Sequence, residues 1–247
     1  MAHIGHKWLK FLSCGCSHGI FADPDAIAAV LKFAEQFKPE TRIHHGDVCD
    51  YAAFRSGAPS SRDEACALGP DLTAGIEFLY KFRPTHVILG NHDDRVFRDA
   101  NHHNAIIALA AAHCRDEFRS AINKLKAKLI DIYDINAAQL QLGDTKFIHG
   151  FGMGGENALR DHAEHFGKCI CAHFHRAESA GGRRDDHPIC YCVGTLATIG
   201  MMEYAKTRRA TARWSHGFAW GEYNDTYCHI NLASCPQGQA KNWRLPL

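Results

Sequence analysis

Residue types that bind metal ions or move protons stand directly after several short apolar runs of this sequence. The first group is Cys16-Ser-His18, which follows the run FLSCG. The further positions are Asp47, Asp50, Asn91, His92, His149, His173 and His175. Thiolate, imidazole, carboxylate and amide oxygen all bind divalent cations, and an imidazole beside a carboxylate can act as a general acid. Together they would support metal-assisted chemistry, provided that the fold brings them into one place.

Cys16 has three interpretations when its surroundings are ignored: half of a metal site, a redox pair with Cys14, or part of a cysteine-rich core strand. The chain has 11 cysteines, so at least one is unpaired within it, and no C-x-x-C motif occurs. Residues i and i+2 of a strand share a face, and such C-x-C pairs occur at Cys14/Cys16, Cys169/Cys171 and Cys190/Cys192. We therefore expect mostly free, buried thiols and a cytoplasmic location. Because the chain also has 18 histidines, a single histidine motif carries little weight.

The length and charge of the chain limit its class. We expect one α/β domain over residues 1–247. The net charge of +1 does not indicate a nucleic-acid partner, although it argues only weakly against one. No apolar run approaches the roughly 18 residues needed to cross a bilayer, so no membrane partner is expected. The amino terminus lacks a sustained apolar segment, and we interpret it as native sequence and not as a signal peptide.

Apolar runs alternate with amphipathic stretches along most of the chain, which predicts βαβ units and a largely buried sheet. The expected strands cover residues 8–13, 41–45, 85–89, 145–149, 168–173 and 189–199, with further strand between 218 and 232. The expected helices cover residues 23–37, 71–82, 103–128 and 157–166. Asp23, with Pro24 after it, and Asp71 have the residue types of helix N-caps. The loops 57–70 and 179–188 are rich in turn formers and are expected to be mobile.

The candidate residues share one position relative to these elements, since each group follows the end of an expected strand. Taken singly, a Gly-Asp pair after a strand is commonly a turn, and a His-x-His is commonly a surface or packing feature. Five groups in this position are harder to explain in that way. In open α/β sheets, ligands bind outside the carboxyl ends of the strands. We therefore expect residues that are spread over about 160 positions to converge in one crevice.

Four motifs at these positions resemble those of the calcineurin-like metallophosphoesterases. GDVCD (46–50) matches GDxxD, GNHD (90–93) matches GNH[DE], and IHG (148–150) matches the single-histidine motif. AHFH (172–175) matches GHxH except at its first residue, Ala172. The resemblance extends from residue 8 to about 200. It implies a four-layered α/β/β/α sandwich of the metallophosphoesterase type around a two-metal centre.

The same resemblance implies a role for each residue. The first metal would be bound by Cys16, His18, Asp47 and His175. Asp47 would bridge to the second metal, whose other ligands would be Asn91, His149 and His173. His92 would protonate the leaving group while Asp50 orients its ring. The implied activity is hydrolysis of phosphomonoesters or phosphodiesters by a water that two divalent cations activate.

Cys16 stands where members of this family normally have aspartate. A thiolate is also an anionic ligand, but it is softer and favours Zn²⁺ or Fe over Mg²⁺. We therefore expect two divalent ions, drawn from Zn, Fe or Mn, with Zn or Fe preferred. In the competing interpretation Cys16 binds weakly or not at all, and the first site is partly empty. A structural zinc site is a further alternative, with the ligands Cys14, Cys16, Cys169 and Cys171.

Tyr51 is a second departure, because the protein serine/threonine phosphatases of the family have arginine there to bind phosphate. Arg95 and Arg176 could substitute for it, or could be surface cations. The missing arginine makes a dedicated phosphoprotein phosphatase less favoured than a general phosphoesterase. Two alternatives stay open: a nuclease-like phosphodiesterase of the same family, and a non-catalytic binding module whose metal centre has decayed.

Overall fold

Two mixed β-sheets form the centre of the computed structural model, which describes residues 7–152, 155–198, 200–205, 209–236 and 238–246. The first sheet has the order β11 (Cys228–Cys235), β10 (His216–Tyr223), β1 (Leu9–Cys14), β2 (Thr41–His44), β3 (His86–Ile88) and β4 (Lys128–Ile130). Strands β1 to β4 are parallel, and β10 pairs with β1 in the antiparallel direction. The second sheet has the order β5 (Gln139–Leu142), β6 (Thr145–Ile148), β7 (Cys169–Cys171), β9 (Ile189–Val193) and β8 (Ala177–Gly181).

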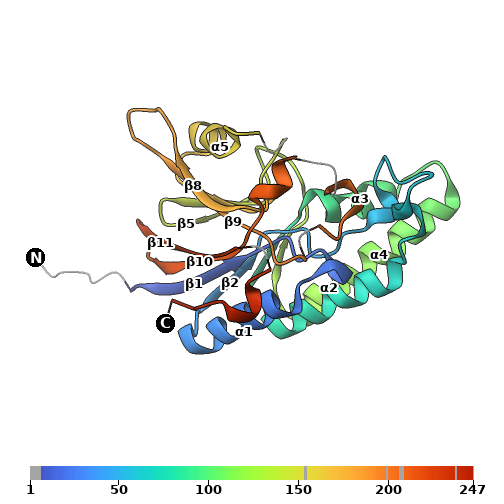
Figure 1. Ribbon diagram of the computed structural model, residues 1–247, viewed down its shortest axis with the longest axis horizontal. Coiled ribbons are helices and arrows are strands. Elements are labelled where there is room, and N and C mark those ends of the chain that lie inside the picture. Colours follow the sequence, from blue (N-terminus) through green and yellow to red (C-terminus); the bar gives the residue numbers. More distant parts are fainter. Residues whose placement is uncertain (1–6, 153–154, 199, 206–208, 237, 247) are drawn as a thin grey trace, which may run out of the picture.

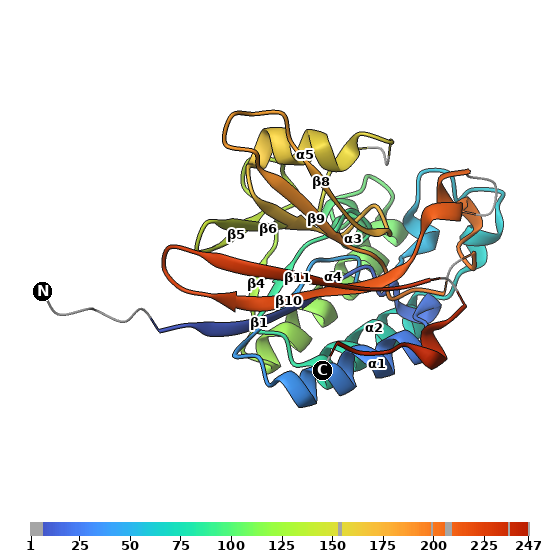
Figure 2. The ribbon, with the colours of Figure 1, turned by 60° about the vertical axis from the view of Figure 1, so that its left-hand side comes forward.

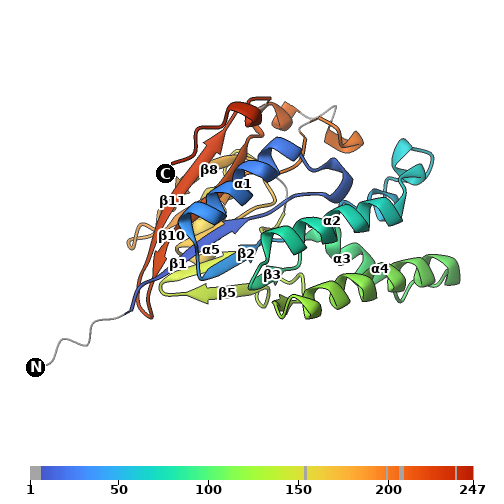
Figure 3. The ribbon, with the colours of Figure 1, turned by 90° about the horizontal axis from the view of Figure 1, so that it is seen from below.

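Helices cover the outer faces of both sheets (Figure 1). The α-helices of the described residues are α1 (Pro24–Phe37), α2 (Leu68–Phe82), α3 (Asn91–Asp99), α4 (Ala105–Lys124) and α5 (Ala158–Phe166). Figures 2 and 3 show α1, α2 and α4 outside the first sheet, with α5 outside the second. Between the sheets, Phe11 of β1 meets Phe147 of β6 edge to face, with ring centroids 5.3 Å apart. The expected four-layered α/β/β/α sandwich is confirmed.

Helix α1 illustrates how local sequence determines an element. The Asp23 carboxylate accepts hydrogen bonds from the backbone N–H groups of Asp25 and Ala26, and Pro24 begins the helix. Its buried face, which includes Val30 and Phe33, packs on the outer face of the first sheet. Full burial of each such side chain contributes about 1.5–3 kcal/mol to stability. The predicted cap and the predicted apolar face are both confirmed.

Several predicted boundaries were wrong. Helix α2 begins at Leu68, so Asp71 lies inside the first turn and is not the N-cap. The expected helix 103–128 ends at Lys124, and residues 128–130 form β4. The expected strand 189–199 ends at Val193, and its last residue lies outside the described part of the chain. Further strand was correctly expected between 218 and 232: β10 and β11 form a hairpin there, and Asn224 Oδ1 accepts two backbone hydrogen bonds in its turn.

Among the described residues, four short α-helices and β-strands were not predicted: α3, β4, β5 and β8. Residues 177–181, which overlap the expected loop 179–188, form β8 and pair with β9. The loop 57–70 contains a single 3-10 turn, Arg62–Ala65, and the start of α2. Within the described part of the chain, no helix combines the length and the apolar character that crossing a membrane requires.

Candidate metal centre

All seven proposed ligands lie just beyond the carboxyl ends of strands in the two sheets. β1, β2 and β3 of the first sheet lead into Cys16, His18, Asp47 and Asn91. β6 and β7 of the second sheet lead into His149, His173 and His175. Residues up to 159 positions apart in the chain therefore meet, because parallel strands end at the same edge of a sheet.

The first group comprises Cys16, His18, Asp47 and His175, each of which has a ligand atom within 4.8 Å of those of the others. Asp47 Oδ2 lies 4.0 Å from Cys16 Sγ and 3.8 Å from His18 Nε2. The Nε2 atoms of His18 and His175 are 3.0 Å apart. All four side chains are buried.

The first group fits a cation because the imidazoles of His18 and His175 have too few protons to give every buried ring nitrogen a hydrogen bond. The His18 Nδ1–H group donates to Asp50 Oδ1 at 2.8 Å, so Nε2 of the neutral ring has a lone pair. That lone pair points at Nε2 of His175. The other ring nitrogen of His175, Nδ1, is buried and has no hydrogen-bond partner among the described residues. A divalent cation between the rings would satisfy both Nε2 atoms.

The second group comprises Asp47, His149 and His173, with Asn91 beside them. Nε2 of His149 lies 3.4 Å from Asp47 Oδ2, the oxygen that also faces the first group. Asn91 Oδ1 lies 3.0 Å from His149 Nε2 and 2.9 Å from His173 Nδ1. Asp47 is therefore shared by both groups, which is the arrangement that a bridging ligand requires.

Backbone carbonyl oxygens accept hydrogen bonds from the ring nitrogens of His149 and His173 that point away from Asn91. Nδ1–H of His149 donates to the carbonyl oxygen of His45 at 2.6 Å, and Nε2–H of His173 donates to that of Gly152 at 2.7 Å. In the neutral rings the inward nitrogens are then lone pairs, and they face carboxylate and amide oxygens. Four converging acceptors repel one another unless a cation lies among them. The second group fits a metal ion on this ground.

Burial and charge leave three of the ligands in the protonation states that metals bind. Burial raises the pKa of the Asp47 carboxyl, but the imidazoles of His149, His92 and His18 outweigh it and hold that pKa well below its usual range. Burial, with His149 nearby, lowers the pKa of His173 to about 4. Burial and the neighbouring His18 hold the pKa of His175 well below its usual range. An ionised carboxylate therefore faces the neutral imidazoles of His173 and His175. Burial lowers the pKa of His149, but the Asp47 carboxylate outweighs it and raises that pKa, so a cation would have to displace a proton from this ring.

The Cys16 thiol also has to lose a proton before it can bind metal as an anion. Burial raises the pKa of Cys16 well above its usual range, and the charge of Asp47 raises it further. The backbone N–H of His173 donates to Sγ at 3.3 Å and lowers the pKa. A cation bound to Sγ would supply the larger stabilisation of the thiolate.

His92 and Asp50 lie next to the first group. The Nδ1–H group of His92 lies 2.9 Å from the carbonyl oxygen of Asp50 and 3.0 Å from its Oδ1. The backbone N–H of His92 donates to Asp47 Oδ1 at 2.8 Å. The Asp50 carboxylate thus contacts two imidazoles, those of His18 and His92. The family resemblance predicted only its contact with His92.

Five of the seven ligand positions have a backbone conformation that only glycine adopts without strain. The φ angles are 53° at Cys16, His18 and Asp47, 54° at His173 and 57° at His175. Positive φ is uncommon for residues other than glycine, and such strained conformations concentrate at functional sites. All five residues lie two to four positions after the end of a strand.

The two predicted arginines lie near the centre, with different partners. Arg95 is half-buried on α3 and donates from Nη1 to the carbonyl oxygen of Asp50 at 2.9 Å. Arg176 is buried, with Nε 2.7 Å from Glu178 Oε1, and it donates from Nη2 to the carbonyl oxygen of Gly155 at 3.0 Å. Arg176 would have to release Glu178 before it could reach a phosphate.

The alternative zinc site of four cysteines was wrong. Cys14 packs in the core beneath α1, whereas Cys169 and Cys171 pack beneath α5 on the outer face of the second sheet. Cys16 lies between the two sheets, among the ligands of the first group. These sulfur atoms therefore cannot share one ion. All 11 cysteines are free thiols.

Several residues that support the centre were not predicted. The Asp93 carboxylate accepts hydrogen bonds from the backbone N–H groups of Val48, Cys49 and Gly90, and so joins two ligand-bearing loops. Asp93 is the last residue of the GNHD motif, and this position could have indicated that it supports the site. Three aromatic rings contact site histidines: Trp214 on His175, Tyr204 on His92 and Tyr133 on His149, with centroids 4.2, 5.7 and 5.8 Å apart. No local pattern in the sequence indicated them.

Comparison with known proteins agrees with this geometry. Residues 9–177 match the sequence profile of the family described as calcineurin-like phosphoesterases. The chain belongs to this family, which comprises metal-dependent enzymes acting on phosphate esters. No curated protein sequence matches the chain.

Solved structures that match this chain include a metallophosphoesterase from Sphaerobacter thermophilus, with 14% identity and a TM-score of 0.49; 95% of this chain and 90% of that chain are covered. A second is YfcE, a phosphoesterase from E. coli, with 16% identity, a TM-score of 0.36, and coverage of 86% and 91%. A third is Vps29 from Chaetomium thermophilum, with 11% identity, a TM-score of 0.38, and coverage of 92% and 95%.

Proposed function

We propose that this protein hydrolyses phosphomonoesters or phosphodiesters with two divalent cations bound at the centre. One observation carries the proposal: two groups of inward-facing ligand atoms share the Asp47 carboxylate. In the first group the other ligands would be Cys16, His18 and His175. In the second they would be Asn91 (through its amide oxygen), His149 and His173.

Each part of the site would then have a chemical role. Two bound cations screen the charge of the phosphate and lower the pKa of a bound water. His92 would act as general acid in its imidazolium form: Nδ1–H donates to the Asp50 carboxylate, which stabilises the charged ring, and Nε2–H would give its proton to the leaving oxygen, leaving the ring neutral. Arg95 would bind a phosphate oxygen with the guanidinium donors that its bond to Asp50 does not use, and Arg176 would assist if it released Glu178.

Cys16 bears on the identity of the metals. A thiolate in the first group favours Zn²⁺ or Fe, with Mn as a further candidate, and disfavours Mg²⁺. Free thiols throughout the chain support a cytoplasmic location, where they stay reduced.

The test combines metal content with two model substrates. Purified protein is subjected to elemental analysis, and its hydrolysis of nitrophenyl phosphate and bis-nitrophenyl phosphate is measured with Zn²⁺, Fe²⁺, Mn²⁺ and Mg²⁺ in turn. Two metals per chain and turnover of either ester would support the proposal, and preference for the diester would favour a nuclease-like phosphodiesterase. Absence of turnover with every metal would contradict the proposal and favour a non-catalytic binding module.

Removing the metals should lower thermal stability, because each group takes ligands from both sheets. Metal at 100 times its dissociation constant stabilises the native state by about 2.7 kcal/mol, which in a chain of this size corresponds to roughly 5–10 °C in Tm. We expect chelation to lower Tm by this amount and added Zn²⁺ to restore it, measured by calorimetry. If the chelator leaves the Tm of metal-loaded protein unchanged, the metals are not bound by ligands from both sheets.

A further inference from the structure

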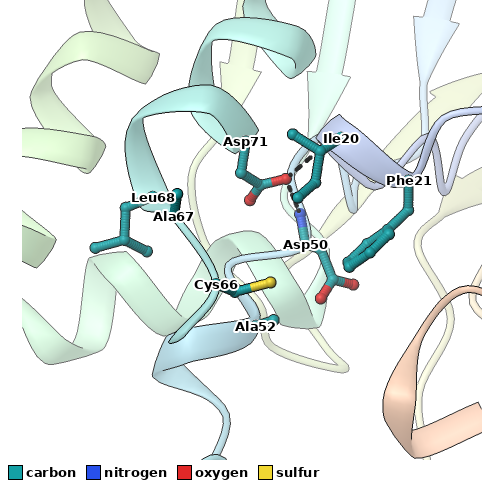
Figure 4. Close-up of a pocket in the computed structure, with 8 residues that line it drawn as sticks. All are labelled: Ile20, Phe21, Asp50, Ala52, Cys66, Ala67, Leu68 and Asp71. Atoms are coloured by element: carbon teal, nitrogen blue, oxygen red, sulfur yellow. Dashed lines mark hydrogen bonds between the residues drawn. The ribbon is translucent and has the colours of Figure 1, made fainter. Parts of the chain in front are cut away.

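Asp71 lies buried between two turns that lead into the metal centre (Figure 4). Its Oδ1 accepts hydrogen bonds from the backbone N–H of Ile20 at 3.2 Å and of Asp50 at 3.3 Å. Its Oδ2 accepts one from the N–H of Tyr51 at 2.7 Å. One carboxylate on α2 therefore ties the turn after β1 to the turn after β2.

Both turns have conformations that need such support. Tyr51 has a φ angle of 46°, and His18 one of 53°, in the left-handed region that costs non-glycine residues free energy. Gly19, next to His18, approaches so closely that an added Cβ would lie 2.0 Å from Asp71 Oδ1. The small pocket around the carboxylate is bordered by the apolar side chains of Ile20, Phe21 and Leu68, as Figure 4 shows. Such apolar surroundings strengthen the hydrogen bonds that the carboxylate accepts.

Asp50 connects the hydrogen bonds of Asp71 to the residues that would perform the proposed chemistry. Its backbone N–H is bound by Asp71, and its Oδ1 contacts Nδ1 of His18 at 2.8 Å and Nδ1 of His92 at 3.0 Å. Displacement of the Asp50 turn would therefore change the orientation of one proposed metal ligand and of the proposed general acid together.

We propose that Asp71 is a positioning residue, which holds Asp50 so that its carboxylate fixes the imidazole rings of His18 and His92. The consequence for catalysis rests on the proposed function, but the positioning itself does not. Substitution of asparagine for Asp71 keeps the shape of the side chain. It replaces an acceptor oxygen by an NH₂ group, which would face one of the three backbone N–H groups and repel it.

The first readout is spectroscopic and needs no turnover. In protein labelled with ¹⁵N-histidine, the Nδ1–H protons that His18 and His92 share with Asp50 should give slowly exchanging downfield signals, assigned by their loss in Asp50→Ala. We expect Asp71→Asn to shift these signals and speed their exchange with water about 10-fold or more. Asp71→Ser is measured in the same way if the asparagine variant does not fold.

Asp63→Asn is the matched control. Asp63 is also a buried carboxylate in the segment between β2 and α2, but it pairs with Arg55 Nε at 2.7 Å and not with the Asp50 turn. It should leave both imidazole signals unchanged. If the Asp71 variant also leaves them unchanged, or if Asp63→Asn shifts them equally, the proposal is overturned.

The second readout is kinetic. Outer-shell substitutions at metal sites commonly cost about 10- to 100-fold in activity. We expect Asp71→Asn to lower kcat by that factor for an alkyl phosphate, whose leaving group needs a proton, and by much less for nitrophenyl phosphate. An equal loss on both esters would contradict the route through His92. A wild-type protein without turnover would contradict the proposed function alone, and the imidazole signals would still decide the role of Asp71.

Discussion

His92→Ala is expected to keep both metal ions but to slow hydrolysis of an alkyl phosphate by about 10²–10⁴-fold, the range for loss of a general acid. His92 belongs to neither of the two groups that share Asp47. Its ligand atom lies instead with those of His18 and Asp50: its ring is 4.7 Å from that of His18 between centroids, and its Nδ1 is hydrogen-bonded to Asp50. Nitrophenyl phosphate should be slowed less, because its leaving group is stable without a proton. The measurement is kcat on both esters, with metal content determined on the same samples.

A suitable control for this substitution is His86→Ala. His86 is half-buried at the start of β3, the end of that strand remote from Asn91, and its Nδ1 contacts Thr85 Oγ1 at 2.9 Å. Its loss should change neither the metal content nor the rates. Full activity of metal-replete His92→Ala would show that the leaving group is protonated by another residue or by water.

Cys16→Ala should reduce the metal content from two ions per chain toward one, with a corresponding loss of activity. Sγ is one of four ligand atoms in the first group, and methyl in its place cannot bind a cation. Cys16→Asp should restore two ions and move the preference from Zn²⁺ or Fe toward Mg²⁺ or Mn²⁺, because carboxylate is a harder ligand than thiolate. Elemental analysis and titration calorimetry with each metal measure both effects.

Cys14→Ala provides the comparison, since Cys14 is equally buried but packs in the apolar core beneath α1. It should lower stability without altering the metal content. An unchanged stoichiometry in Cys16→Ala would remove the thiolate from the ligand set and favour the interpretation in which this position binds weakly or not at all.

The fold and the location of the proposed ligands followed from local patterns. The apolar strands β1, β2, β3, β6 and β7 were all predicted within about two residues, since buried parallel strands have short, continuous apolar runs. Their ends predicted where the ligand-type residues meet. Strands β5 and β8 were not predicted, because both lie at an edge of the second sheet and have mixed, partly exposed residues.

The supporting contacts could not be predicted, because they depend on pairs of residues far apart in the sequence. Asp71 has the residue type of an N-cap, but its carboxylate binds two loops that lie about 20 and 50 positions before it. Helix α3 was not predicted: Asp93 accepts a hydrogen bond from the N–H of Gly90 and caps the helix that Asn91 starts. Nothing near Asp50 in the sequence indicates that it contacts His18.

The distribution of the ligands over both sheets has a consequence for how this chain can evolve. His175 approaches Cys16, His18 and Asp47 from the opposite layer, and His149 and His173 approach Asp47 in the same way. A cation held there would also fasten one half of the molecule to the other. A descendant that abandoned turnover would still be under selection to keep these side chains, because dropping them would loosen the sandwich. An intact ligand set is therefore no guarantee of an active enzyme, and the rate and the metal content have to be measured separately.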